Sequence, residues 1–195
     1  MTATLERGFK SWAERTATSL RAELSISAKE RLDPRQLASY LNVQLCTPND
    51  IEGLSSVAKD QLLVIDPSGW SAVTLEKGGN ALIIFNPTHS DGRQSSDITH
   101  ELSHIILGHK PATLIMSQDG SLVMRSYDQK QEDEANWLAA ALLLPREALL
   151  HCKRNKLSAS DIAILFGVSE ALASYRLRIT GVEAQLRRAQ KFSRN

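Results

Sequence analysis

The motif His100-Glu101-Leu102-Ser103-His104 constrains this chain more than any other part of its sequence. On an α-helix, residues four positions apart lie on one face, so the imidazoles of His100 and His104 can bind the same divalent metal ion. Glu101 follows the first histidine and can reach a metal-bound water without being a ligand itself. This pattern is typical of zinc hydrolases, in which zinc lowers the pKa of a bound water to about 7.

Apolar residues around the motif indicate a helix that is buried on one side. They recur at helical spacing and are Ile98, Leu102, Ile105 and Ile106. A buried helix does not carry two histidines and a glutamate without partners, because unpaired polar groups are costly to bury. A metal site is therefore a better interpretation than a solvated His/Glu face on a surface helix.

A catalytic zinc ion needs a third protein ligand, which leaves the fourth position to water. A metzincin would supply it in the spacing H-E-x-x-H-x-x-G-x-x-H, but this chain has Leu107 and Lys110 at the last two defined positions, so that class is excluded. Gly108 is expected to end the helix in a left-handed cap. His109 follows this break, and we interpret it as a surface residue or a support for a ligand rather than as a ligand.

A glutamate on a later helix is the remaining candidate for the third ligand. Glu132 and Asn136 are four positions apart, so Glu132 can bind zinc while Asn136 holds a ligand histidine by a hydrogen bond. Glu134 points about 200° around the helix axis from Glu132. We therefore prefer Glu132 and keep Glu134 as the alternative.

The rest of the chain alternates between helical and strand-like patterns, which predicts an α+β fold with a small antiparallel or mixed sheet. Two hairpins are predicted, residues 70–75 with 81–85 and residues 113–116 with 122–125. Helices are expected over the first 25 or so residues, after the cap Asp33-Pro34, from Arg93 to Gly108, and over residues 128–144.

The C-terminal part of the chain differs from the rest in charge. Residues 153–195 hold nine Lys or Arg and three Asp or Glu, a net charge of +6, whereas the whole chain carries +1 and residues 1–152 therefore carry −5. We expect a packing helix over residues 1–30, a peptidase core over residues 30–152 and a basic helical segment over residues 153–195 that packs on the core. A basic segment suggests an acidic partner or nucleic acid, although a solvated basic helix is the commoner case.

Within this segment, residues 160–176 resemble a helix-turn-helix. A small residue at Ala163, a turn glycine at Gly167 and a helix cap at Ser169 all suit two helices that cross closely. Helix-turn-helix geometry is also a common packing unit, so binding of DNA is the less favoured interpretation of this segment.

The sequence further suggests a cytoplasmic protein. No apolar run approaches the length of a membrane span, and the first residues lack the basic start and apolar core of a signal peptide. Cys46 and Cys152 are far apart and have no CxxC spacing, so they support neither a disulfide framework nor a cysteine zinc site.

With these motifs in place, the chain resembles the ImmA/IrrE family of zinc metallopeptidases, which are gluzincin-like. The resemblance covers roughly residues 30–180 and rests on Asn86-Pro87, Arg93, Thr99 to His104, Glu132 to Pro145, Ala163, Phe166, Val168-Ser169 and Arg176-Leu177. Two positions depart from the family, which commonly has Gly at Ser103 and often Phe at Leu138. Neither change removes a catalytic group.

The resemblance implies a zincin-like fold and a zinc-dependent endopeptidase that cleaves a protein, a helix-turn-helix transcriptional repressor, in a stress-response or mobile-element system. Zn²⁺ would bind His100, His104 and Glu132, and Glu101 would be the acid/base group. In zincins an extended substrate pairs with a strand edge beside the metal, and Ala81 to Phe85 is the strand expected here.

Two questions stay open at this point. The oxyanion needs a donor besides zinc, for which Tyr127, His89 and His151 are candidates. The rival function is a DNA- or repressor-binding regulator with a structural or vestigial zinc site. It draws on the basic segment, but a structural zinc site has no use for Glu101. A peptidase whose basic segment docks the repressor or its DNA combines both.

Overall fold

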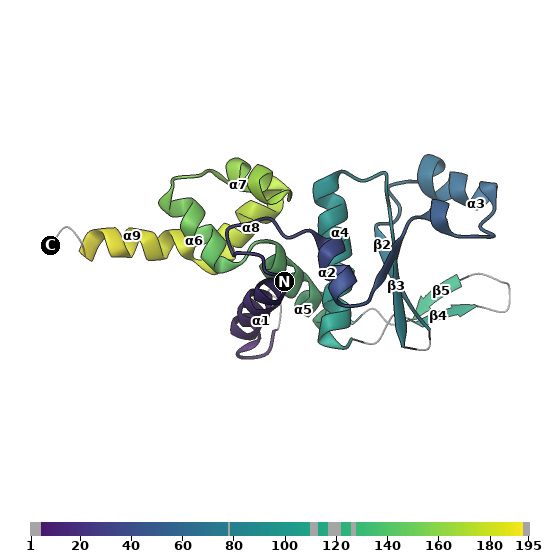
Figure 1. Ribbon diagram of the computed structural model, residues 1–195, viewed down its shortest axis with the longest axis horizontal. Coiled ribbons are helices and arrows are strands. Elements are labelled where there is room, and N and C mark those ends of the chain that lie inside the picture. The colour runs from purple at the N-terminus through teal and green to yellow at the C-terminus, as the bar shows by residue number, and fades with distance from the viewer. Residues whose placement is uncertain (1–4, 78, 110–112, 117–121, 126–127, 193–195) are drawn as a thin grey trace.

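A single long helix, α4 (Asp91–Leu107), lies between a small β-sheet and helix α5 (Gln129–Leu143) (Figure 1). The computed structural model describes residues 5–77, 79–109, 113–116, 122–125 and 128–192. The other helices are α1 (Phe9–Glu23), α2 (Pro34–Tyr40), α3 (Ser56–Asp60), α6 (Arg146–Arg154), α7 (Ala159–Phe166), α8 (Glu170–Thr180) and α9 (Val182–Phe192). Short 3₁₀ and π-helical turns cover Pro48–Asp50 and Gln61–Ile65. Among the described helices, none is both long and apolar enough to cross a bilayer.

The sheet has three strands in the order β1-β3-β2, with β1 (Gln44–Cys46), β2 (Ala72–Lys77) and β3 (Asn80–Phe85). Strand β3 pairs antiparallel with β2 and parallel with β1, so the sheet is mixed. A separate antiparallel pair consists of β4 (Thr113–Met116) and β5 (Leu122–Arg125). Both predicted hairpins and the mixed α+β character are thereby confirmed.

Helix α4 packs on one face of this sheet because its apolar stripe matches an inward residue of the central strand. Ile98 and Leu102 of α4 and Ile83 of β3 are all fully buried in one hydrophobic cluster. The helix begins at Asp91, two residues before the predicted start, and ends at Gly108, which has the expected left-handed conformation with φ +66°. The motif therefore lies in the last three turns of a helix whose apolar side is packed on the sheet.

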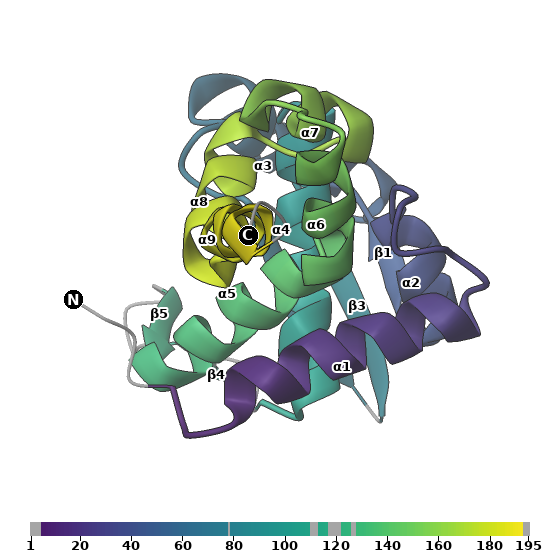
Figure 2. The same ribbon diagram turned by 90° about the vertical axis from the view of Figure 1, so that its left-hand side faces the viewer.

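Helix α5 joins the two hydrophobic clusters of the protein. Leu138 and Leu142 belong to the cluster around α4 and the sheet, and Leu143 and Leu144 belong to a second cluster formed with α6 to α9. Helix α1 packs along α5 through the fully buried Ala13 and Ala17 (Figure 2). The division of the chain into three segments remains a prediction. Helix α5 contributes residues to both hydrophobic clusters.

Two buried arginines hydrogen-bond to the C-terminal carbonyl groups of α5. Arg21 of α1 donates to the carbonyl oxygens of Leu142 and Leu143, at 3.0 and 3.2 Å. Arg176 of α8 donates to that of Leu144 at 3.0 and 2.8 Å. Burial lowers the pKa of Arg21 to about 10, so its guanidinium stays charged at neutral pH. These cations satisfy carbonyls that a helix end leaves unpaired and lie at the negative end of the helix dipole.

Helices α7 and α8 are joined by a short turn, and Ser169 caps α8 by accepting a hydrogen bond from the Leu172 backbone. Gly167 in the turn has φ +64°. The turn packs against the N-terminal end of α4, where a Cβ added to Gly92 would lie 3.3 Å from the Val168 carbonyl carbon. The predicted helix pair is present, its turn contacts the body of the protein, and DNA binding by this pair remains a prediction. Helix α9 projects beyond it (Figure 1).

Candidate metal centre

Helices α4 and α5 bring three candidate metal ligands together. The Nε2 atoms of His100 and His104 are 3.1 Å apart. Glu132 of α5 places one carboxylate oxygen 3.2 Å from Nε2 of His100 and the other 3.4 Å from Nε2 of His104. Ligand atoms about 2.0–2.2 Å from a tetrahedral zinc ion lie about 3.3 Å from one another. The two imidazoles and the carboxylate thus have the spacing and the chemistry that one zinc ion requires.

Burial keeps His104 neutral. The pKa of His104 is lowered to about 4, first by burial and then by the charges of His100 and His109 nearby. A neutral imidazole is the form that binds a metal, so His104 does not have to lose a proton first at neutral pH.

Glu101 lies beside the ligand set and faces a pocket of about 380 Å³. Burial raises the pKa of its carboxyl group, while a hydrogen bond from Thr74 and the charge of His100 oppose that rise. The Thr74 hydroxyl donates to Glu101 at 2.5 Å. The pocket is lined by Ser71, Ala72, Ser96, Asp97, His100, Glu101 and Asn136. A carboxylate with a raised pKa in such a pocket is suited to accept a proton from water.

The two glutamates of α5 have different partners. Glu132 faces the two histidines of the motif, whereas Glu134 lies 3.2 Å from Nε2 of His109. The geometry therefore favours Glu132 over Glu134 as the third ligand. Asn136 is exposed and lines the same pocket as His100, but within the described part of the chain no hydrogen bond joins its amide to either ligand histidine. Its supporting role remains a prediction.

The structure does not bring the described candidates for the oxyanion donor to the pocket. His89 lies with Nδ1 2.9 Å from Asp97 and Nε2 3.4 Å from the Asn86 amide, and it does not line the pocket. His151 is on α6, where its Nε2 faces Asn155 at 3.3 Å. Tyr127 lies outside the described residues.

The prediction that residues 81–85 form the edge strand that binds the substrate was wrong. Residues 81–85 belong to β3, the central strand, whose two edges are occupied by β1 and β2. Strand β2 is the edge of this sheet that lies beside the site, because Thr74 contacts Glu101 and Ala72 lines the pocket. The sequence predicted two neighbouring strands but could not show that β1, far earlier in the chain, covers the outer side of β3.

Thr74 is the main residue of the site that the sequence did not single out. Its hydroxyl reaches Glu101 because Thr74 pairs with the buried Ile83 of β3 and shares its side of the sheet. Alternation along the strand was the available signal, since Val73 and Leu75 lie on the other face. A half-buried polar residue on the sheet side that faces the motif helix, such as Thr74 of β2, is a candidate contact of the site.

A protein-family model matches more than half of the chain. The model for Peptidase_M78, the IrrE N-terminal-like domain, matches residues 62–178. That range begins before β2 and ends in α8, so it contains the complete candidate centre. No curated protein gives a match to this chain. Because the matched range exceeds half of the chain, the protein belongs to the Peptidase_M78 family of metallopeptidases, whose domain is the IrrE N-terminal-like domain.

Proposed function

We propose that this protein is a zinc-dependent endopeptidase. The observation that carries the proposal is the cluster of three potential ligands, His100, His104 and Glu132. Glu101 lies next to it and lines the same pocket as His100. A His₂Glu set is a common ligand set for catalytic zinc and leaves one position open. Bound there, zinc would supply Lewis-acid activation of water and of the scissile carbonyl group.

Glu101 would carry the proton in this reaction. It accepts a proton from the attacking water and gives it to the leaving amine, as a carboxylate within hydrogen-bond reach can do. The Thr74 hydroxyl donates to one oxygen of Glu101 and so orients the carboxylate. Within the described residues no hydrogen bond engages the other oxygen, which can then accept from water. This placement supports an enzyme over a structural zinc site, in which Glu101 would have no task.

The substrate would be an extended segment of a protein chain. Strand β2 has a free edge within the described sheet, and Ser71 and Ala72 at its start line the pocket that contains His100 and Glu101. An extended peptide can add to such an edge through backbone hydrogen bonds, which brings a peptide bond alongside the metal centre. We further propose, from the family resemblance, that this segment belongs to a helix-turn-helix repressor in a stress-response or mobile-element system.

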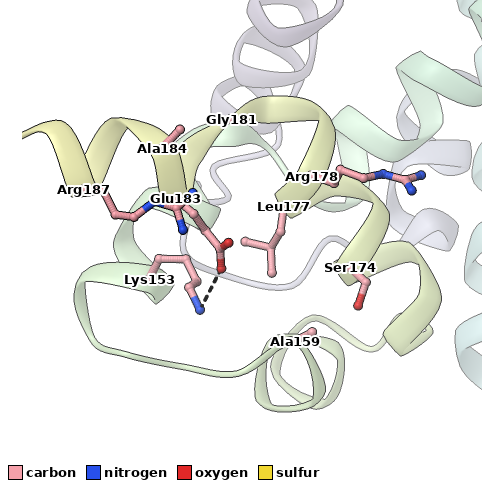
Figure 3. Close-up of a pocket in the computed structure, with 9 residues that line it drawn as sticks. All are labelled: Lys153, Ala159, Ser174, Leu177, Arg178, Gly181, Glu183, Ala184 and Arg187. Carbon is pink, nitrogen blue, oxygen red and sulfur yellow. Dashed lines mark ion pairs between the residues drawn. The ribbon is translucent and has the colours of Figure 1, made fainter.

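The C-terminal helices offer a second docking surface for such a protein. A pocket of about 480 Å³ lies between α6, α7, α8 and α9 (Figure 3). Its lining includes the cations Lys153, Arg178 and Arg187, with apolar side chains such as Leu177, and Lys153 pairs with Glu183 at 3.2 Å. Basic and apolar groups together suit an acidic segment of the substrate protein.

The helix pair α7 and α8 is less well suited to bind a DNA duplex. A helix that reads DNA presents its N-terminal residues to base edges and phosphates. The first turn of α8 presents the exposed acid Glu170 there, and Arg176 of the same helix is buried against α5. A regulator that binds DNA without cleaving protein is accordingly the second candidate function.

A cleavage assay tests the proposal. Purified protein with zinc is incubated with candidate repressors and with a mixture of unstructured proteins, and new termini are identified by mass spectrometry. We expect discrete cleavage by the wild type and none by Glu101→Gln, since general-base groups contribute about 10²–10⁴-fold. Equal cleavage by both proteins would contradict the proposed role of Glu101, and the absence of cleavage in every condition would favour the DNA-binding alternative.

A further inference from the structure

The end of helix α4 brings a third histidine against the metal centre. Gly108 adopts a left-handed conformation, its N–H donates to the Ile105 carbonyl, and the N–H of His109 donates to the His104 carbonyl at 3.0 Å. This is the hydrogen-bond pattern of a Schellman cap, in which the residue after the cap folds back onto the last turn. The two residues that meet are usually apolar, but here both are histidines.

The side chains continue this contact as a hydrogen-bonded chain. Nδ1 of His109 lies 3.0 Å from Nδ1 of His104, and Nε2 of His109 lies 3.2 Å from a carboxylate oxygen of Glu134. The side chains of His109 and Glu134 are only 8% and 14% exposed, so water competes little for these contacts. Lys130 lies 3.9 Å from the other oxygen of Glu134.

One placement of protons satisfies the whole chain. An ionised Glu134 can only accept, so Nε2 of His109 carries a hydrogen. A neutral His109 then has a bare Nδ1, which accepts the hydrogen on Nδ1 of His104. Nε2 of His104 is left with a free lone pair, and this is the atom that faces Nε2 of His100 and the carboxylate of Glu132. The reverse placement would put a hydrogen on the ligand atom itself.

We propose that His109 and Glu134 are positioning residues that fix the tautomer and the ring orientation of His104 for metal binding. The proposal rests on the proposed zinc site and adds a support for it that the motif does not contain. Within the described residues, Nδ1 of His100 has no such partner. Partners of this kind typically change metal affinity by about 10–100-fold when they are replaced.

Zinc affinity and imidazole NMR test this inference together. The zinc Kd is measured by competition with a chromogenic chelator, and the His104 tautomer is read from ¹H–¹⁵N spectra of the metal-free protein labelled at its imidazole nitrogens. We expect His109→Phe to weaken zinc binding about 10–100-fold and to leave His104 as a mixture of tautomers. His109→Gln, whose amide oxygen can accept from Nδ1 of His104, should bind within a few-fold of the wild type.

The controls separate a hydrogen bond from a change in charge or folding. Asp133→Asn removes a carboxylate from the same helix and should leave both readouts unchanged. If circular dichroism shows that His109→Phe is unfolded, Glu134→Leu takes its place, with the same expected direction. Wild-type zinc affinity together with a wild-type His104 tautomer in His109→Phe, or in Glu134→Leu where it takes its place, would overturn the inference. A wild type that binds no zinc would refute the proposed function instead, while the tautomer of its metal-free form would still test the positioning role.

Discussion

The hydroxyl group of Thr74 opposes the effect of burial on Glu101. Burial raises the pKa of this carboxyl group, and the hydrogen bond from Thr74 is the largest influence in the other direction. The bond also fixes one carboxylate oxygen on the side of the sheet, at 2.5 Å. A neutral strand residue thus influences the pKa of the group to which we assign proton transfer.

Replacing Thr74 with valine should shift the pH dependence of peptide hydrolysis. Thr74→Val keeps the shape but removes the donor, so the pKa of Glu101 rises further. A general base must be ionised, and activity is lost as the pH falls through its pKa. The acidic limb of the kcat/KM profile should therefore move to higher pH, whereas Thr74→Ser should keep the wild-type limb. An unmoved limb in Thr74→Val would show that this contact does not set the pKa.

Helix α5 illustrates how an element is held where the site needs it. Its first turns carry Glu132 and Glu134, and its last carbonyl groups accept hydrogen bonds from Arg21 and Arg176. Arg176 also pairs with Glu14 of α1 at 2.6 Å, so one guanidinium links three helices. Elements from both ends of the chain therefore fix the position of the helix that supplies the third ligand.

Loss of this guanidinium should destabilise the protein strongly. Arg176→Met keeps most of the volume but removes the guanidinium donors of the Leu144 carbonyl and of one Glu14 carboxylate oxygen. Breaking a buried pair in this way costs about 3–5 kcal/mol. Urea unfolding followed by circular dichroism measures the change. Arg178→Met, at an exposed position of the same helix, should change the free energy of unfolding by less than about 0.5 kcal/mol. Equal effects of the two substitutions would refute the linking role of Arg176.

At the scale of the whole molecule, the metal centre and the basic helices are parts of one packed body. Leu143 and Leu144 place the end of α5 in the C-terminal cluster, and the turn before Val168 contacts the start of α4 at Gly92. A protein bound to the C-terminal pocket would thus be held at a fixed position relative to the site. Docking and cleavage by one chain are compatible with this arrangement.

Charge reversal in the C-terminal pocket should affect large substrates only. Arg187 and its neighbour Arg188 are both exposed, but of the two only Arg187 lines the pocket. We expect Arg187→Glu to reduce kcat/KM several-fold for an acidic protein substrate and to leave that for a short peptide unchanged, because the short peptide reaches only the metal centre. Arg188→Glu makes the same change in net charge and serves as the control. Equal losses in both variants would point to general electrostatic attraction.

Much of the site could be predicted because it depends on local spacing. The helical period placed His100 and His104 on one face and separated Glu132 from Glu134, and Gly108 marked the end of the helix. All of these relations extend over a few residues of one helix. The pairing of Glu132 with the histidines needed only the further assumption that the two helices meet.

The parts that were missed depend on contacts between distant segments. The parallel pairing of β1 with β3 makes β3 the central strand, and no local pattern in residues 81–85 reveals it. The contact of His109 with Glu134 joins residues 25 positions apart, and the sequence alone gave His109 a supporting or surface role without a partner. Strand order and side-chain partners of this kind follow from packing rather than from periodicity.

The zinc content of the purified protein tests the central claim most directly. Wild type, Glu101→Gln and His104→Ala are prepared side by side, supplied with zinc, and measured by elemental analysis. We predict about one zinc ion per chain in wild type and in Glu101→Gln, and far less in His104→Ala, since two of the three ligands cannot hold the ion as firmly. A wild type without zinc, or a His104→Ala variant that retains it fully, would contradict the assignment of this site.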